Sequence, residues 1–425
     1  MAQLSLIVTS YNVDQYVEAS LQSVLDQSLT DTEVIVVDDG STDSSADIIE
    51  RVAKSDPRVI PLLLKENSPG GVATAANAGL DLATAPYVGF VDADDLCDPV
   101  MFERLLGAAV ATDSDLAMCN YRLLDDDSGE LAVPADEHRW RELEADYFQL
   151  DPWTRKRFLR FVAGPWRKLY RREFLESNAI RFPEGDFFFE DNPFHWFSVL
   201  CAGSLALVPE SLYYHRVTRA GQTMATPDER LFRIFAHHQT ILDWLLERGL
   251  DASYRSSLLE WVISQFEWIV RRTPSDLRRE LYQSVRPIIE EYSFATIDEA
   301  LRDGRKGDLT RQLVRSLRND SFADFNRVLD YDGASSSLVE KARYHLRYGG
   351  VREAARVATR FAASRTVPRR SSSGGAEGIE AAEARLRNKD IMFALLVMER
   401  RLGAIDDRLR CLESRLEQLG DRADE

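Results

Sequence analysis

Three short apolar runs near the start of the chain alternate with segments in which apolar residues recur at helical spacing. The runs are rich in Val and Ile and cover residues 4–9, 33–37 and 87–91. Runs of this length and composition are typical of parallel strands that are buried on both faces. The helical spacing occurs in residues 17–25, 48–52 and 73–83. Strands that alternate with helices predict an α/β fold with a doubly wound, mostly parallel sheet.

The pattern changes along the chain and predicts four parts. Residues 1–225 carry the sheet, and residues 226–364 form a helical accessory region with few strand signals. Residues 365–378, RTVPRRSSSGGAEG, are rich in Pro, Gly and Ser, as is typical of a flexible linker. Residues 379–425 are expected to form one long coiled-coil helix.

This last segment carries a heptad repeat. Apolar residues alternate at spacings of three and four, with Asn388, Leu395, Leu402, Leu409 and Leu416 at position a and Ile391, Met398, Ile405, Leu412 and Leu419 at position d. Acids at e and arginines at g pair opposite charges between parallel chains, whereas antiparallel chains would pair like charges. Leu at a with partial Ile at d favours three or four strands. We therefore predict a parallel homo-oligomer, with a trimer favoured, whose register Asn388 would fix.

Composition narrows the range of partners and compartments. The chain has 425 residues and a net charge of −17, so it lacks the general cationic surface that binding to nucleic acid needs. Its four cysteines are widely spread, which argues against a disulfide framework or a zinc site. The sequence contains neither a signal-peptide pattern nor an apolar run long enough to span a membrane. We expect a cytoplasmic protein, which at most contacts the inner face of the membrane.

Polar side chains follow each of the three predicted strands. The first strand ends at Thr9 and Tyr11, the second at Asp38 and Asp39, and the third at Asp92, Asp94 and Asp95. Ligands of open α/β sheets bind beyond the carboxyl ends of the strands. Carboxylates gathered there repel one another, and a hard divalent cation such as Mg²⁺ or Mn²⁺ would compensate for this. The alternative interpretation is a turn with a helix N-cap at Ser41 or Asp43, followed later by an ordinary acidic loop.

Residues 1–225 resemble family 2 glycosyltransferases of the GT-A fold. The matching stretches are LSLIVTSYN, EVIVVDDGSTDSS, YVGFVDADD and FPEGDFFFEDNPFHW. The resemblance implies that the donor nucleotide is bound by Thr9, Tyr11, Asp38, Asp39 and Asn67. It also implies that Asp92 and Asp94 form a DxD motif, in which Asp94 ligates a metal ion and Asp92 contacts the ribose or a metal-bound water. Ala76 stands where the family usually carries Arg, which leaves the base of the donor open.

The pair Glu190-Asp191 lies where the resembling family carries its catalytic base. An inverting transfer needs a carboxylate that takes the proton from the acceptor hydroxyl. The resemblance assigns this role to Asp191 and places Glu190 beside it in the acceptor site. The alternative is that Asp191 only caps a helix that runs through His195.

Two further segments hold candidate ligands. In YYHR, the resemblance implies that His215 completes the metal site and Arg216 binds the diphosphate, although a lone histidine is often a core or surface residue. The stretch GPWRKLYRREFL resembles the family's acceptor cleft and implies contacts from Trp166 and Lys168. Residues 152–172 contain eight Lys and Arg residues, which suit an anionic acceptor, an anionic membrane surface or a solvated helix face.

Together these features predict an inverting, divalent-metal-dependent glycosyltransferase. It would move a sugar from a UDP-sugar or similar donor to a hydroxyl of a surface polysaccharide, a wall polymer or a lipid-linked glycan. A sugar nucleotidyltransferase is one alternative, although the Ser10-Tyr11-Asn12 segment lacks the basic, Gly-rich loop that binds a triphosphate. The other alternative is a non-catalytic, oligomeric binding protein that derives from the same fold.

Removal of residues 379–425 is expected to convert an oligomer into a monomer, because this segment carries the whole heptad repeat. The catalytic candidates all precede residue 220, so the rate at a saturating small acceptor should stay near that of the full chain. Avidity for a repeating polymer should fall, since several linked catalytic sites raise the effective concentration. Light scattering on both proteins measures the change, and equal monomeric masses would contradict the predicted coiled coil.

Overall fold

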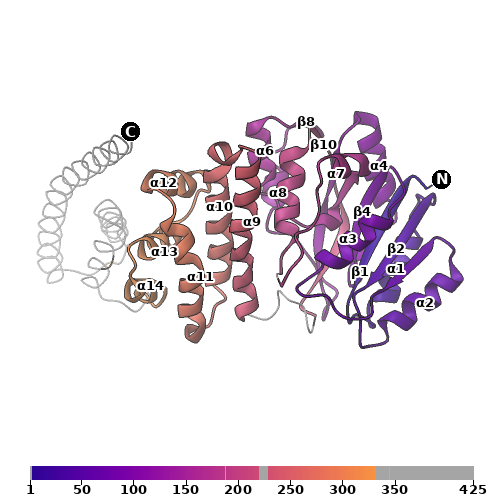
Figure 1. The fold of residues 1–425 in the computed structure, drawn as a ribbon, viewed down its shortest axis with the longest axis horizontal. Helices are drawn as coiled ribbons and strands as arrows, with labels where there is room; N and C mark the ends of the chain where they lie inside the picture. Colours follow the sequence, from indigo (N-terminus) through magenta and orange to yellow (C-terminus); the bar gives the residue numbers. More distant parts are fainter. Residues whose placement is uncertain (1, 187, 220–227, 332–343, 345–425) are drawn as a thin grey trace, which may run out of the picture. The chain divides into compact units, whose positions relative to one another are not determined.

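The computed structural model describes residues 2–186, 188–219, 228–331 and 344 (Figure 1). The chain divides into two compact units, Met1–Arg305 and Lys306–Glu425. The first unit contains the sheet and most of the described helices. The predicted linker and coiled coil lie outside the described residues, and the predicted boundary at residue 225 stays a prediction.

The described strands of the first unit form one ten-stranded sheet. Its main path runs β3-β2-β1-β4-β9-β6-β10-β5, with β7 and β8 attached to β6 and β10. The strands are β1 (Leu4–Ser10), β2 (Thr32–Asp38), β3 (Val59–Leu63), β4 (Tyr87–Asp92), β5 (Leu96–Cys97), β6 (Leu116–Asp125), β7 (Leu131–Ala132), β8 (Tyr147–Gln149), β9 (Lys168–Arg171) and β10 (Ser204–Val217). Neighbours from β3 to β4 are parallel, β9 is antiparallel to both β4 and β6, and β6 is parallel to β10. The predicted mixed α/β fold with a mostly parallel sheet is confirmed.

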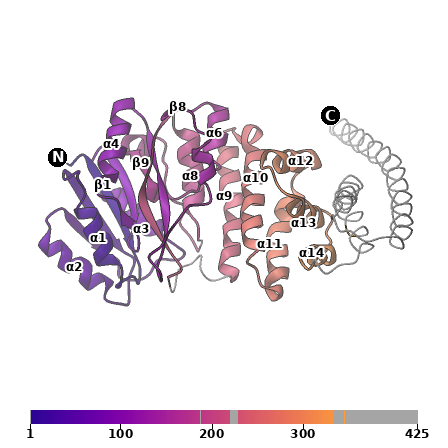
Figure 2. The ribbon, with the colours of Figure 1, turned by 180° about the vertical axis from the view of Figure 1, so that it is seen from behind.

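Helices cover both faces of this sheet (Figures 1 and 2). They are α1 (Val17–Leu25), α2 (Ser45–Ser55), α3 (Ala73–Leu82), α4 (Met101–Thr112), α5 (Glu137–Trp140), α6 (Pro152–Phe158), α7 (Arg172–Ser177) and α8 (Asp191–Cys201). Leu6 and Val8 of β1 belong to the core that includes the buried faces of α1 and α4. On the other face, Ile7 lies so close to α3 that a methyl group at Gly79 would come within 2.4 Å of it. Successive side chains of β1 thus pack into two separate cores, one on each face of the sheet, as a doubly wound sheet requires.

The sequence predicted the buried strands better than the marginal ones. The runs 4–9, 33–37 and 87–91 coincide with β1, β2 and β4. Strand β3 was not predicted, because it lies at the sheet edge, contains Pro61 and is only partly buried, and such strands lack a continuous apolar run. Strands β8 and β9 are also short, with three and four residues, and so they too lack an apolar run of the length that identifies β1, β2 and β4.

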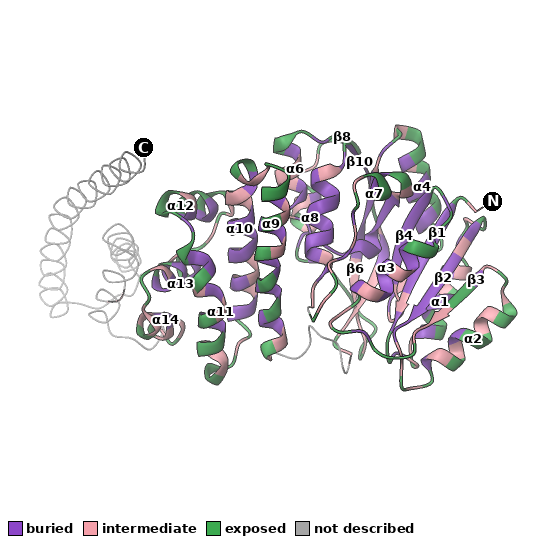
Figure 3. Ribbon diagram, in the orientation of Figure 1, coloured by how far each residue is buried: buried purple, intermediate pink, exposed green. Residues whose placement is uncertain are grey.

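A layer of helices follows the sheet within the first unit. It consists of a 3₁₀ segment, η2 (Glu229–Ala236), and of α9 (His237–Glu247), α10 (Asp251–Val270), α11 (Arg278–Glu290) and α12 (Phe294–Asp303). The layer touches α8 directly: Phe197 stacks on Trp244 with centroids 4.7 Å apart, and the Trp261 indole donates to Asn192 at 3.1 Å. Figure 3 shows buried positions along the strands and along the helix faces that pack together. The helix that begins at Asp191 is therefore held between the sheet and the helical layer.

In the second unit the described helices are α13 (Asp308–Arg318) and α14 (Phe322–Leu329). They pack on each other through apolar residues such as Leu313, Leu317, Phe325 and Val328. None of the described helices combines the length and the apolar composition needed to cross a membrane.

Candidate active site

The parallel register brings the polar ends of β1, β2 and β4 to one edge of the sheet. Ser10 lies opposite Asp38, and Thr9 lies opposite Asp92. The Thr9 hydroxyl is 3.5 Å from a carboxylate oxygen of Asp92, and Tyr11 beyond them is exposed. The structure thus gathers these predicted site residues because the strands are adjacent and parallel.

The two acids after β2 face different partners. Asp38 accepts hydrogen bonds from the backbone and the hydroxyl of Ser41 at 2.9 and 2.6 Å, so it closes its own turn. Asp39 accepts from the backbone and the hydroxyl of Ser68 at 3.1 and 2.7 Å. Asn67, the neighbour of Ser68, is exposed. The turn interpretation therefore describes Asp38, whereas Asp39 reaches across to a second loop.

The N-cap of α2 is Ser44, and Asp43 lies one residue before it. Its carboxylate accepts from the backbone of Ser45 at 2.9 Å, at the start of α2. The Ser41 hydroxyl instead donates to Asp38 and accepts from the backbone of Asn12 at 2.9 Å. The same short stretch thus contains residues that hold the turn and residues of the candidate site.

A potential metal-binding group lies at the end of β4. Ligand atoms of Asp92, Asp95 and His215 all lie within 4.8 Å of one another. Burial, then the charges of Asp95 and Asp94, raise the pKa of Asp92 well above its ordinary value. Burial alone would lower the pKa of His215, but the charge of Asp95 and a 2.8 Å hydrogen bond to it raise the pKa to about 9. The group is short of positive charge, and carboxylate oxygens with an imidazole suit Mn²⁺ or Mg²⁺.

Asp94 and Asp95 have different partners in this structure. Asp94, predicted as the direct metal ligand, forms an ion pair with Arg219 in this structure. Asp95, which was absent from the predicted ligand set, is fully buried beside His215. A DxD pattern marks the first and third positions, but which carboxylate turns inward depends on the turn between Asp92 and Asp95.

Strand β10 supplies the cations that face these acids. Arg216 donates from its backbone to Asp95 and from its guanidinium to the Asp94 carbonyl, both at 2.7 Å. The same side chain pairs with Asp126 at 2.7 Å, and Asp126 also accepts from the Tyr16 hydroxyl at 2.6 Å. Arg216 therefore lies next to the acidic edge, where several partners hold its guanidinium in place, and its contact with a diphosphate stays a prediction.

Glu190 and Asp191 point to different surroundings although they are adjacent. Burial raises the pKa of Asp191, and the nearby Lys168 lowers it. Asp191 accepts from the Asn192 side chain at 2.9 Å, and α8 has no side-chain N-cap hydrogen bond in this described segment. Glu190, expected in the acceptor site, is 2% exposed and accepts from the backbone of Gly71 at 2.8 Å. Its burial raises its pKa to about 7.

The two candidates for acceptor binding are buried in this structure. Trp166 stacks with Tyr213 and His215, with ring centroids 4.6 and 5.1 Å away. The Lys168 ammonium donates to the carbonyls of Ala163 and Gly164, each at 2.8 Å. Burial lowers the pKa of Lys168 well below its ordinary value. These contacts give both residues a place in the wall behind the site, and an acceptor contact by either stays a prediction.

The cationic segment 152–172 does not form one basic surface. Arg167 is buried in an ion pair with Asp136 at 2.8 Å, and Arg160 pairs with Glu260 at 2.7 Å. Arg155 donates to the Ala202 carbonyl, and Arg171 pairs with Asp113. Many of these charges are thus engaged inside the fold, which weakens the expectation of a large anionic partner at this segment.

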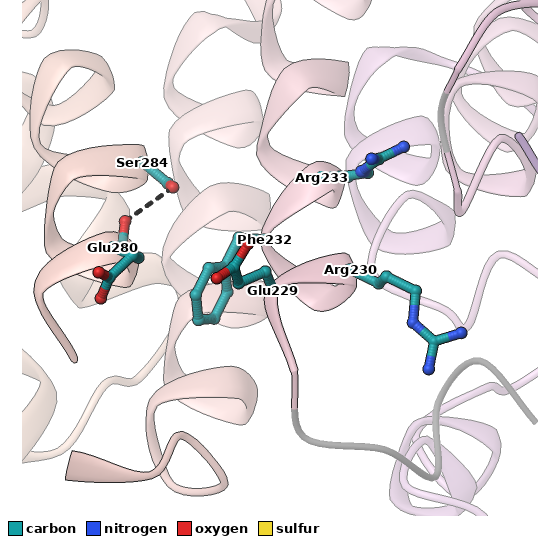
Figure 4. Close-up of a pocket in the computed structure, with 6 residues that line it drawn as sticks. All are labelled: Glu229, Arg230, Phe232, Arg233, Glu280 and Ser284. Atoms are coloured by element: carbon teal, nitrogen blue, oxygen red, sulfur yellow. Dashed lines mark hydrogen bonds between the residues drawn. The ribbon is translucent and has the colours of Figure 1, made fainter. Parts of the chain in front are cut away.

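A pocket of about 380 Å³ lies in the helical layer, away from the strand ends (Figure 4). It is lined by Glu229, Arg230, Phe232, Arg233, Glu280 and Ser284 from η2 and α11. Cations and acids both line it, and the Ser284 hydroxyl is satisfied by the Glu280 carbonyl at 2.9 Å. None of the predicted site residues lines this pocket.

Comparison with known families identifies the sheet region. Residues 5–178 match the family model described as glycosyl transferase family 2. The chain is 34% identical over 218 residues to the uncharacterized glycosyltransferase EpsJ of Bacillus subtilis, which covers 50% of this chain and 60% of EpsJ. It is 28% identical over 225 residues to the poly(ribitol-phosphate) beta-glucosyltransferase of Bacillus spizizenii, which covers 52% of this chain and 33% of that protein. The chain therefore matches well under two thirds of the length of these relatives.

Solved structures share the fold over a longer stretch. TarS 1-349 of S. aureus, crystallised in complex with UDP-GlcNAc, superposes with a TM-score of 0.60 at 22% identity. The match covers 77% of this chain and 90% of that one. The common architecture thus extends past the sheet region into the helices that follow it.

The buried Glu190 carboxyl predicts a pH-dependent effect on stability. Its pKa is about 7 in the folded chain against an ordinary 4.5, so between these values the native state binds more protons than the unfolded state. Stability attributable to Glu190 is therefore lost as pH rises through this window, by on the order of 3 kcal/mol. We expect Glu190→Gln to match the wild type in Tm at pH 4.5 and to exceed it at pH 8, measured in EDTA.

The exposed Glu66 provides the control for this measurement, because Glu66→Gln changes the same functional group without changing a buried site. A Tm difference between Glu190→Gln and the wild type that is constant from pH 4.5 to pH 8 would contradict the raised pKa.

Proposed function

Because residues 5–178 match the model of glycosyl transferase family 2, we propose that the protein is an inverting, divalent-metal-dependent glycosyltransferase. Its donor is a nucleotide-diphosphate sugar, with UDP as the nucleotide, and its acceptor is a hydroxyl of a surface polysaccharide, wall polymer or lipid-linked glycan. The observation that carries the proposal is the group of Asp92, Asp95 and His215 beside Thr9 at the sheet edge. The wall-polymer enzyme of B. spizizenii and the UDP-GlcNAc complex of TarS support the acceptor and donor classes.

The acidic edge fits a divalent cation by its chemistry. The carboxylates of Asp92 and Asp95 lie together, and the pKa of Asp92 is raised by burial and by its acidic neighbours, which is the state that a bound cation would relieve. Mn²⁺ or Mg²⁺ would be held by residues of the set Asp92, Asp94, Asp95 and His215. When bound, the ion would neutralise charge that develops on the departing diphosphate.

On the donor side, the proposal assigns the nucleotide to the ends of β1 and β2. Thr9, Tyr11, Asp39 and Asn67 would contact the base and ribose, and Asp38 would hold the turn that presents Asp39, since its carboxylate is bonded to Ser41. Arg216 would face the diphosphate, because it already lies against Asp94 and Asp95.

The acceptor reaction is assigned to Asp191. Its carboxylate would take the proton of the acceptor hydroxyl while that oxygen bonds to the anomeric carbon and the nucleoside diphosphate leaves with the bonding electrons. Attack from the side opposite the leaving group inverts the anomeric centre. Burial raises the pKa of Asp191 and the charge of Lys168 lowers it, so the two effects together set its strength as a base.

Removal of the Asp94 carboxylate tests the metal assignment. Asp94→Ala is expected to weaken UDP binding in the presence of Mn²⁺ by at least tenfold and to abolish turnover. The reason is that the cation, which would neutralise the charge of the diphosphate, loses a proposed ligand. Titration calorimetry with UDP and Mn²⁺ measures the affinity. Asp81→Ala, which removes an exposed surface carboxylate, should bind as the wild type does, and unchanged affinity in Asp94→Ala would refute Asp94 as a metal ligand.

Replacement of the proposed base separates chemistry from binding. Asp191→Asn is nearly isosteric, so it should fold and bind UDP normally, while transfer falls by roughly 10²–10⁴ because a positioned base contributes about that factor. Steady-state rates and UDP affinity are measured together. The exposed Asp186 of the same segment offers a control in Asp186→Asn, and near-normal transfer by Asp191→Asn would move the base to another residue.

A further inference from the structure

The loop of residues 68–71 is fixed at both ends by carboxylates from the two sides of the site. At its start, the backbone and hydroxyl of Ser68 donate to Asp39 at 3.1 and 2.7 Å. At its end, the backbone of Gly71 donates to Glu190 at 2.8 Å. Asp39 belongs to the proposed nucleotide site, and Glu190 is the neighbour of the proposed base Asp191. Four residues therefore connect the donor side to the acceptor side.

The contact at Gly71 has no room for a side chain. A Cβ at this position would lie 2.6 and 2.8 Å from the two carboxylate oxygens of Glu190. Glu190 is 2% exposed, so its carboxylate has little space to move aside. Glycine is needed here for the close approach, and the approach exists because the Glu190 carboxylate lies against the loop that leads into α3.

The contacts at the two ends of the loop, Ser68 with Asp39 and Gly71 with Glu190, can transmit a displacement from one end to the other. Ser68 and Glu190 are buried, with 9% and 2% of their surfaces exposed, and their hydrogen bonds at the two ends of the loop are 2.7 and 2.8 Å long. The turn behind Asp39 is also tight, since a Cβ at Gly40 would approach the backbone of Glu66 to 2.4 Å. A shift of Asp39 therefore moves Ser68, and a shift of Gly71 moves Glu190.

We propose that loop 68–71 couples occupation of the nucleotide site to the placement of Asp191, with Glu190 as the positioning residue. The inference rests on the proposed function and adds a structural connection between the donor side and the acceptor side of the site. A nucleotide held by Asp39 would fix Ser68, and the loop would then fix Glu190 and the start of α8. Because coupling between two sites is reciprocal, loss of the Glu190 anchor must also weaken nucleotide binding.

A double-mutant cycle on UDP affinity in Mn²⁺ tests the coupling. Glu190→Ala and Ser68→Ala are each expected to weaken UDP binding about fivefold, at the lower end of typical coupling. If both substitutions act through one loop, the loss of UDP affinity in the double variant is at least threefold smaller than the product of the two single-variant losses. The reason is that the effects of neighbouring residues in one network are not additive. The control pairs Glu190→Ala with Thr9→Ala, which removes a hydroxyl of the proposed nucleotide site on β1, outside the loop, and should give the full product.

Hydrogen exchange at the start of α8 provides a second readout that a purely structural role would not change. In the wild type, UDP with Mn²⁺ should slow amide exchange in residues 190–194. Gly71→Ala pushes a methyl group into the Glu190 carboxylate and should remove most of this protection while UDP still binds. Gly107→Ala in α4, where the new methyl group meets no atom within 4 Å, should keep it.

The outcomes distinguish this inference from the function on which it rests. Suppose that UDP binds the wild type, that the losses of affinity multiply in both mutant cycles, and that UDP still protects residues 190–194 of Gly71→Ala from exchange. The coupling is then refuted and the proposed function stands. If the wild type binds neither UDP nor another nucleoside diphosphate in Mn²⁺, the proposed function fails and the inference fails with it. Non-additivity confined to the Ser68 cycle, with protection lost in Gly71→Ala, supports the coupling.

Discussion

Repulsion among carboxylates at the end of β4 is the constraint around which the rest of the site is built. Three aspartates occur within four residues there, and burial raises the cost of their charges. His215 of β10 pairs with Asp95, and Arg219, two residues beyond the strand, pairs with Asp94. The backbone N–H of Arg216 donates to Asp95. Irregular register between Val208 and Tyr213, where β10 pairs with β6, accompanies this arrangement, and bulges of this kind re-aim side chains. These pairs offset part of the negative charge at the edge of the sheet, and the pKa of Asp92 stays raised.

Pairing of opposite charges also explains why Lys and Arg residues of the cationic segment 152–172 can lie inside the fold. Strand β9 runs antiparallel between β4 and β6, and it carries Lys168 into the wall behind Asp191. Arg167 beside it is neutralised by Asp136, with both side chains almost fully buried. Removing one member of such a pair commonly costs about 3–5 kcal/mol. Much of the positive charge that the sequence concentrates in residues 152–172 thus stabilises the fold and sets the surroundings of the candidate base.

Sequence patterns predicted the features that depend on local chemistry. Continuous apolar runs identified β1, β2 and β4, and the acids at their ends identified the edge where the candidate site lies. Patterns could not show that Asp95 turns inward while Asp94 meets Arg219, or that Glu190 faces Gly71, because these directions depend on segments more than a hundred residues apart. Burial of Lys168 was also hidden, since a basic residue in a basic stretch looks exposed until the strand that contains it is placed.

Trp166 joins the core of the sheet to the acidic edge through stacked rings. Its indole lies nearly parallel to both the Tyr213 ring and the His215 imidazole, at interplanar angles of 13° and 8°. The imidazole also shares a hydrogen bond with Asp95, so an event that alters the charge or position of His215 changes the electronic surroundings of this indole. Trp166, one of the seven tryptophans of the chain, is therefore the residue whose intrinsic fluorescence we expect to respond to a change at the acidic edge.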